Sequence, residues 1–86
     1  MKARYAINVR TSFQFGFLYC KNVNVTNTGN ANGNWQINLP VKGYVTGMRG
    51  AIGQQVGGQL YAAGMMFNRV LAPGAMTQFS YCGFNF

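Results

Sequence analysis

The stretch that decides the fold is residues 3–25, ARYAINVRTSFQFGFLYCKNVNV, in which apolar and polar residues alternate. Ten of its twelve odd-numbered positions are apolar or aromatic, whereas its even-numbered positions are mostly polar. A period of two places successive side chains on opposite faces of a β-strand. The pattern therefore predicts a strand with one solvated face and one buried face, and the buried face carries the aromatic run Phe13, Phe15, Phe17 and Tyr19.

This alternating segment is too long for one ordinary strand. At about 3.3 Å per residue, an extended segment of 23 residues would span roughly 75 Å, and strands in globular proteins are much shorter. We therefore expect the chain to bend at Thr11-Ser12 or at Gly16, or to run across more than one subunit.

A β-hairpin is predicted over residues 21–45. The cluster Gly-Asn-Ala-Asn-Gly-Asn at 29–34 is typical of a turn. A three-residue loop ending at Gly33 would set Val25 opposite Leu39, so that apolar side chains share one face of the hairpin.

The next segment is rich in glycine, and its apolar residues recur at steps of three and four. This is the period of a helix, and we predict a glycine-rich helix over about residues 46–72. Gly53 and Gly57 have the spacing of closely packed helix pairs. The glycines also oppose a helix, since each costs about 1 kcal/mol relative to alanine. Strand and loop are therefore the alternative for this segment.

Aromatic alternation returns near the C-terminus and predicts a final strand. The expected fold class is α+β, dominated by β-structure: an antiparallel sheet with the hairpin at residues 21–45, the helix at about 46–72 and the C-terminal strand. An all-β fold is the alternative. The 86 residues (1–86) are expected to form a single small domain or one protomer of an assembly.

The chain contains seven Lys or Arg residues and no Asp, Glu or His. This composition excludes carboxylate pairs for glycoside hydrolysis, Ser-His-Asp triads, and carboxylate sites for magnesium or calcium. We therefore expect a protein that is not an enzyme, with no catalytic residue, metal, cofactor or small-molecule substrate. The positive charges have no side chain of opposite sign within the chain, so a partner with negative charge is expected to neutralise them.

Two cysteines, Cys20 and Cys82, could form a disulfide or remain free thiols, and the sequence leaves both states open. A bridge between them would close a loop of about 60 residues, which the chain-entropy model values at roughly 4 kcal/mol. Asn8 and Arg10 interrupt the residues that follow the basic start of the chain, so no cleavable signal peptide is expected.

The leading functional hypothesis is a structural, self-assembling protein, a small component of a virus or phage particle such as a capsid, shell or filament subunit. Its partners would be copies of itself, other subunits of the particle and a polyanion, either nucleic acid or an anionic membrane, and its location would be the virion or an assembled particle. Nucleic acid or acidic neighbouring subunits would neutralise its positive charge. One alternative is a cationic membrane-active or cell-surface protein, such as a toxin or an oligomeric pore. Another is a small nucleic-acid-binding module.

These hypotheses assign two sets of residues. The expected polyanion contacts are dispersed cations, which would position a phosphate backbone without reading sequence: Arg4, Arg10, Lys21, Lys42, Arg49 and Arg69. The expected assembly interface combines the aromatic run with two glycines: Phe13, Phe15, Phe17, Tyr19, Gly53 and Gly57.

Overall fold

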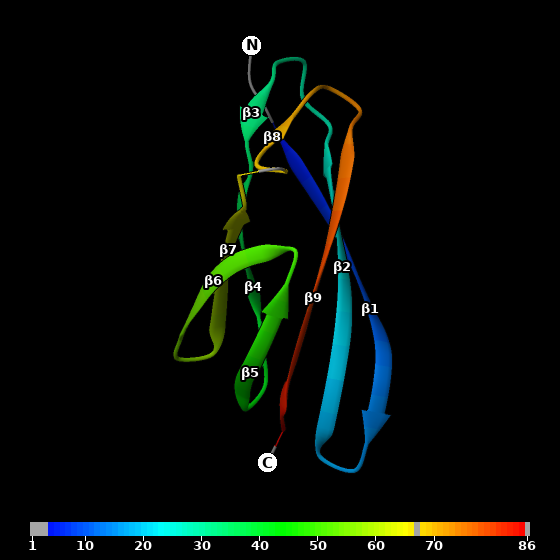
Figure 1. Cartoon of the computed structure of the whole chain (residues 1–86), viewed down its shortest axis with the longest axis vertical. Coiled ribbons are helices and arrows are strands. Elements are labelled where there is room, and N and C mark those ends of the chain that lie inside the picture. The colour runs from blue at the N-terminus through cyan, green and yellow to red at the C-terminus, as the bar shows by residue number, and fades with distance from the viewer. Residues whose placement is uncertain (1–3, 67, 86) are drawn as a thin grey trace.

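A computed structural model describes residues 4–66 and 68–85, and these residues form β-strands and no helix (Figure 1). The strands are β1 (Tyr5–Phe15), β2 (Leu18–Asn27), β3 (Gly33–Asn34), β4 (Gln36–Pro40), β5 (Tyr44–Arg49), β6 (Ala51–Val56), β7 (Gln59–Gly64), β8 (Val70–Leu71) and β9 (Met76–Phe84). The all-β alternative is therefore correct, and the expected α+β class is wrong.

The strands form two main antiparallel sheets. The large sheet has the order β1-β2-β9-β5, the small sheet has the order β4-β7-β6, and β3 pairs with β8 at one end of the molecule (Figure 1). Buried apolar side chains from both main sheets form one core. The fold is therefore a β-sandwich, in which each sheet presents one face to the core and one face to solvent.

The core is built around Trp35, which lies between β3 and β4 and is almost completely buried. Its ring stacks on that of Phe79 of the large sheet, with 5.5 Å between ring centroids and 15° between ring planes. The indole nitrogen donates a hydrogen bond to the carbonyl oxygen of Asn68 at 2.8 Å, so the polar atom of this side chain is satisfied. Val23 and Leu60 pack into the same core from the two opposing sheets.

The N-terminal alternating segment is a hairpin of β1 and β2, not one long strand. Both expected bend positions are used: the chain reverses at Gly16, which has a φ of 60°, and the register shifts between Thr11 and Phe13. This bulge adds one residue to β1, so the residues after it change faces. The predicted common face is therefore wrong: Phe13 is exposed, whereas Tyr19 on β2 is buried.

The predicted hairpin over residues 21–45 is also wrong. Strand β2 pairs with β1 and β9 in the large sheet, and β4 pairs with β7 in the small sheet. Val25 and Leu39 are both buried in the core, but they enter it from opposite sheets. Alternation correctly indicates which side of β2 is buried, but it does not indicate which strand lies next to β2 in a sheet.

The predicted helix over residues 46–72 is wrong as well, because this segment forms the end of β5 followed by β6, β7 and β8. The two-residue turn Gly57-Gly58 joins β6 to β7, and Gly57 has a φ of 59°, a conformation that favours glycine. Gly53 lies within β6, so Gly53 and Gly57 belong to a β-hairpin and not to a pair of packed helices. Within the described ranges, no helix is long and apolar enough to cross a membrane.

The predicted C-terminal strand is confirmed as β9, which lies between β2 and β5 in the large sheet. Cys20 of β2 and Cys82 of β9 stand opposite each other and are joined by a disulfide. The bridge therefore links the two central strands of the large sheet across 62 positions of sequence.

Asn27, at the end of β2, is completely buried and organises the end of the sandwich near β3 and β8. Its amide nitrogen donates hydrogen bonds to the carbonyl oxygens of Ala31 and Leu71 at 2.9 and 2.8 Å. Its side-chain oxygen accepts hydrogen bonds from the backbone nitrogens of Gly29 and Arg4 at 2.9 and 3.3 Å. One side chain therefore satisfies backbone groups from several separate segments of the chain.

Replacing Asn27 with leucine should lower the free energy of unfolding by about 3 kcal/mol or more, because buried backbone groups would lose their partners at roughly 1–3 kcal/mol each. Urea unfolding followed by tryptophan fluorescence measures this loss. Asn32→Ala in the exposed loop nearby is the matched control and should change stability by less than about 0.5 kcal/mol. Equal stabilities of the two variants would contradict the assigned role of Asn27.

Candidate functional site

The two faces of the large sheet differ in chemistry, and the strand register assigns each residue to a face. Directly paired residues of antiparallel strands point to the same side of a sheet. Tyr19 and Val23 of β2 are buried against the core, so their neighbours Leu18, Cys20 and Asn22 point the other way. We call this solvent-facing side the outer face of the large sheet.

A row of large side chains crosses the outer face at the end nearest the β1–β2 turn. Phe15 pairs with Leu18, Leu18 pairs with Phe84, and Phe84 pairs with Tyr44, so the row contains one residue from each of the four strands. Three strand spacings of about 4.8 Å give the row a length of roughly 14 Å. Phe15 is 73% exposed and Tyr44 is 65% exposed, which is unusual for aromatic side chains that serve only the fold.

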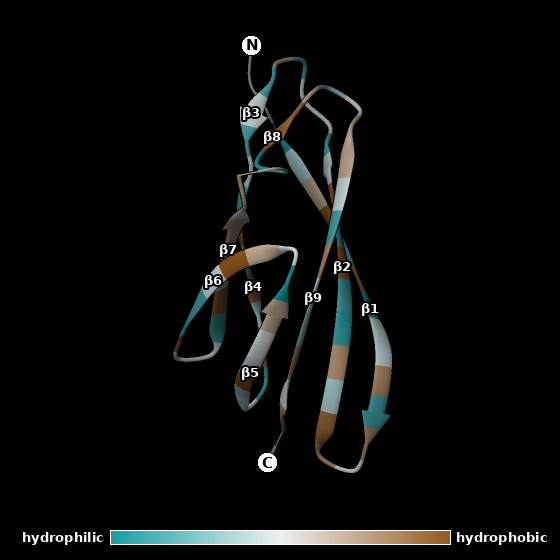
Figure 2. Ribbon diagram, in the orientation of Figure 1, coloured by the Kyte–Doolittle hydropathy of each residue, from teal (hydrophilic) through white to brown (hydrophobic). Residues whose placement is uncertain are grey.

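The neighbouring row continues this apolar surface. Phe13, which is 52% exposed, pairs with Cys20, and the disulfide joins Cys20 to Cys82 on the same face. The ring of Phe17, in the β1–β2 turn, lies 5.9 Å from that of Phe84. Figure 2 shows the hydropathic alternation along β2 and its apolar end beside this turn. We call this end of the outer face the aromatic end; its aromatic residues are Phe13, Phe15, Phe17, Tyr44 and Phe84.

Polar rows follow the aromatic end along the same face. Arg10 pairs with Asn22, Asn22 pairs with Ser80, and Ser80 pairs with Arg49. Beyond them, Asn24 pairs with both Asn8 and Gln78. An open hollow lies over this region and is lined by Asn22, Arg49, Gly50, Gln78, Phe79 and Ser80. The outer face therefore combines exposed aromatic rings with a set of hydrogen-bond donors and acceptors.

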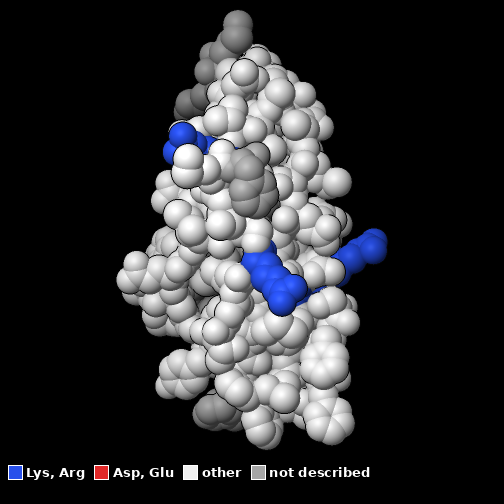
Figure 3. Space-filling model, in the orientation of Figure 1, with Lys and Arg blue, Asp and Glu red and all other residues white. Residues whose placement is uncertain are grey.

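The structure divides the six predicted polyanion contacts among separate places. Arg10 and Arg49 share one row of the outer face, and Lys21 and Lys42 line a cleft on the other side of the large sheet. Arg4 and Arg69 are exposed and belong to neither group: they lie next to β1 and β8. In Figure 3 two cationic side chains lie near each other across the middle of the visible face, and another stands apart from them, so the cations do not form one patch.

The predicted assembly residues are also separated. Phe13, Phe15 and Phe17 lie at the aromatic end, whereas Tyr19 is buried, and its hydroxyl donates a hydrogen bond to the carbonyl oxygen of Lys42 at 2.7 Å. The two predicted glycines, Gly53 and Gly57, lie in the small sheet and its turn. Tyr44 and the uncharged members of the polar rows were not identified from the sequence, because only the pairing of distant strands brings them beside the phenylalanines.

Burial changes the acid–base behaviour of two tyrosines on the inner side of the large sheet. Burial and, to a smaller extent, the neighbouring Tyr19 together raise the pKa of Tyr81 to about 12. Burial also raises the pKa of Tyr19 above its usual value. Both effects favour the neutral phenol in the folded protein.

The fold resembles those of domains from proteins that act on or bind chitin and related sugars. No protein-family model matches the chain. The solution structure of the chitin-binding domain of Chi18aC from Streptomyces coelicolor superposes with a TM-score of 0.77 at 23% identity, covering 94% of this chain and 80% of that domain. Chitinase ChiA74 from Bacillus thuringiensis gives a TM-score of 0.81 at 14% identity, covering 92% of this chain and 13% of that enzyme.

Two further comparisons extend this result. The GH20 exo-β-N-acetylglucosaminidase from Vibrio harveyi gives a TM-score of 0.81 at 12% identity, covering 94% of this chain and 13% of the enzyme. In sequence, the chain is 48% identical over 64 residues to the major extracellular endoglucanase of Xanthomonas campestris pv. campestris. That match covers 74% of this chain and 13% of the endoglucanase, so the chain spans only a small part of its relative's length.

These findings correct the functional hypotheses drawn from composition. The chain is similar to part of an extracellular endoglucanase and shares its fold with a chitin-binding domain. These two findings overturn the virus or phage particle hypothesis. They also overturn the virion location and the particle and nucleic-acid partners that the hypothesis implied. The membrane-active and nucleic-acid-binding alternatives fit these findings no better. The error has a physical origin: uncompensated positive charge indicates a preference for negative surroundings, but it does not identify the surface that binds.

The titratable side chains predict an unusual dependence of stability on pH. Because its two cysteines are bridged, the chain has no side chain with an ordinary pKa between about 4.5 and 9. It also has no carboxylate side chain that acid could protonate. Above about pH 10, the unfolded state loses tyrosine protons that folded Tyr81 retains until about pH 12. The free energy of unfolding should therefore stay constant from about pH 4 to 9 and fall above pH 10.

Urea unfolding at a series of pH values measures this profile. Tyr81→Phe removes the phenol with the largest increase in pKa and should reduce the alkaline loss between pH 10 and 12. A wild-type profile that falls between pH 6 and 4, or an alkaline slope that is identical in Tyr81→Phe, would contradict this prediction.

Proposed function

We propose that this chain is a non-catalytic carbohydrate-binding module that attaches to an insoluble β-linked polysaccharide of the chitin and cellulose class. The single observation that carries the proposal is the exposed aromatic end of the outer face, beside rows of amide, hydroxyl and guanidinium groups. The names of the similar proteins support the same class of ligand, since they include a chitin-binding domain, a chitinase and an endoglucanase.

The chemistry of the outer face matches that of a sugar chain. A pyranose ring presents C–H groups on its flat sides and hydroxyl groups around its edge. Phe15 and Tyr44 offer exposed rings on which the flat sides can stack. Asn22 and Ser80 offer hydrogen-bond donors and acceptors to the hydroxyl groups of adjoining sugars. An open sheet face suits a polysaccharide surface better than it suits a small molecule that needs enclosure.

A binding role without catalysis follows from the composition of the chain. Glycoside hydrolysis generally uses a pair of Asp or Glu side chains that flank the bond to be cleaved, and this chain has none. The chain covers 13% of the endoglucanase that it resembles, and the activity of that enzyme belongs to the whole protein. We propose that the chain acts outside the cell, as the extracellular relative does, and that it holds a polysaccharide surface without cleaving it.

Adsorption to insoluble chitin and to crystalline cellulose tests this function. The wild-type protein should be depleted from solution by at least one of the two polymers. Phe15→Ala and Tyr44→Ala should each weaken that binding by about tenfold or more, since loss of one stacked ring costs on the order of 1–2 kcal/mol.

Tyr61→Ala is the matched control, because Tyr61 is an exposed aromatic residue on the small sheet, 43% exposed and remote from the outer face. It should bind as the wild type does, and the thermal unfolding midpoints of all variants establish that they are folded. No binding of the wild type to either polymer would overturn the proposal. An equal loss in Tyr61→Ala and Phe15→Ala would show that the outer face is not the binding surface.

A further inference from the structure

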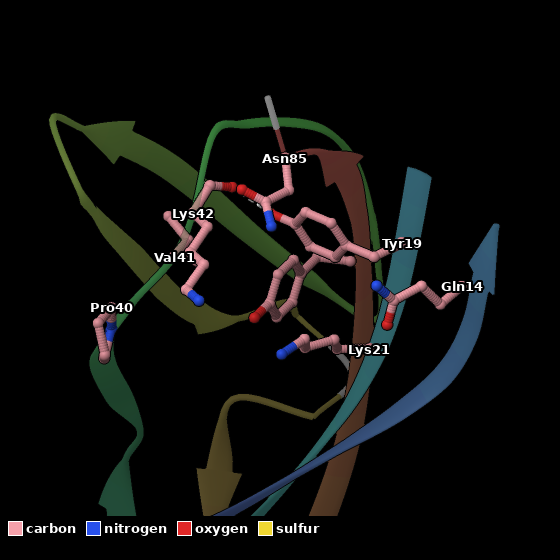
Figure 4. A pocket seen from close by; sticks show the side chains of 8 residues that line it. Gln14, Tyr19, Lys21, Pro40, Val41, Lys42 and Asn85 are labelled. Atoms are coloured by element: carbon pink, nitrogen blue, oxygen red, sulfur yellow. Dashed lines mark hydrogen bonds between the residues drawn. The ribbon is translucent and has the colours of Figure 1, made fainter. Parts of the chain in front are cut away.

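A cleft lies on the opposite side of the large sheet from the proposed polysaccharide-binding face. It has a volume of about 330 Å³, and its polar lining comes from Gln14, Tyr19, Lys21, Lys42, Tyr81 and Asn85. The strand register places four of these on the inner side, because Gln14 pairs with Tyr19 and Lys21 pairs with Tyr81. The loop between β4 and β5, which carries Lys42, forms the facing wall (Figure 4). This cleft is therefore spatially separate from the aromatic end.

The cleft is rich in hydrogen-bond donors and positive charge. The side chains of Lys21 and Lys42 both extend into it, as Figure 4 shows. The Lys21 ammonium nitrogen lies 5.9 Å from the centroid of the Tyr19 ring, which favours a cation at this position. The chain contains no Asp or Glu side chain, so neither lysine has a carboxylate side chain as a partner.

Tyr81 adds a neutral hydrogen-bond donor to the lining of the cleft. Its side chain is only 2% exposed and lines the cleft, but its hydroxyl has no hydrogen-bond partner among the described residues. The hydroxyl of Tyr19, in contrast, already donates a hydrogen bond to the carbonyl oxygen of Lys42. Among the described residues, no side-chain oxygen or nitrogen that is shielded from solvent lacks a hydrogen-bond partner, so the Tyr81 hydroxyl is accessible and offers a donor to the cleft beside two ammonium groups.

We propose that this cleft binds a small oxyanion, a carboxylate or a sulfate group, carried by a molecule of about the size of one sugar. The anion would accept hydrogen bonds from the ammonium groups of Lys21 and Lys42 and from the hydroxyl of Tyr81. Hydrogen bonds between charged partners are stronger than those between neutral ones, and partial enclosure strengthens them further. The volume is at the lower end of the range for small-molecule sites, which suits a monosaccharide unit.

The proposed ligand differs from the neutral polysaccharides of the outer face. An acidic sugar would present its carboxylate to the lysines and its hydroxyl groups to Gln14 and Asn85. The same chain would then hold a neutral polysaccharide on one side of the large sheet and an acidic group on the other. This site does not depend on the polysaccharide-binding function, so either can fail without the other.

Titration of the ¹⁵N-labelled protein with sodium glucuronate, sodium sulfate and glucose tests the proposal, with ionic strength held constant by sodium chloride. Glucuronate or sulfate should shift the amide signals of Lys21, Lys42 and Tyr81 in a saturable way, whereas glucose should not. A response to glucuronate alone identifies a carboxylate, and a response to sulfate alone identifies a sulfate group. No saturable shift with either anion, or an equal response to glucose, would overturn the proposal.

Variants separate a specific site from general attraction to a positive protein. Lys21→Gln should weaken anion binding by about tenfold, and Tyr81→Phe, which preserves the ring, by several-fold. Arg69→Gln removes the same charge from an exposed position outside the cleft and should change the affinity by less than about twofold. Lys42 is exposed, so Lys42→Gln should leave folding intact and is the second lysine variant in which anion binding is measured. Equal losses in Arg69→Gln and in both lysine variants would show non-specific screening and overturn the site.

Discussion

The pairing of β2 with β9 is the constraint on which the rest of the molecule depends. These central strands of the large sheet pair without a register shift from Leu18 opposite Phe84 to Thr26 opposite Met76. The disulfide joins Cys20 to Cys82 within this register. A slip of one residue would exchange every core residue of these strands for a solvent-facing one. The register therefore fixes the core, the outer face and the cleft together.

The two outer strands of the large sheet adapt to this fixed centre through irregularities. In β1 the register shifts between Thr11 and Phe13, and in β5 it shifts between Val45 and Gly47. The shift in β1 places Phe13 on the outer face and Gln14 in the cleft. Exposed aromatic side chains are a liability for a soluble protein unless a ligand covers them. Their collection at the aromatic end, beside the β1–β2 turn, supports the proposed binding role.

Much of the core could be predicted from the sequence, but the candidate sites could not. Alternation correctly assigned Tyr19, Val23 and Val25 to the buried face, because those residues lie on one uninterrupted strand. It misassigned Phe13, since the bend expected at Thr11-Ser12 is a bulge that moves the residues after it to the other face, and the pattern of residue types does not show this. The outer row could not be predicted either, because Tyr44 becomes a neighbour of the phenylalanines only through its pairing with β9. The absence of acidic residues limited the chemistry without indicating a ligand.

The central proposal is that the outer face of the large sheet binds polysaccharide and that the inner cleft does not. Mapping amide chemical shifts with a soluble chito-oligosaccharide and a cello-oligosaccharide tests it most directly. The expected result is a continuous set of shifted amides on the outer face, which includes Phe13, Phe15, Tyr44 and Ser80. The amides of Lys21 in the cleft and of the small sheet should remain unchanged. Shifts concentrated on β6 and β7, or in the cleft with none on the outer face, would contradict the assignment.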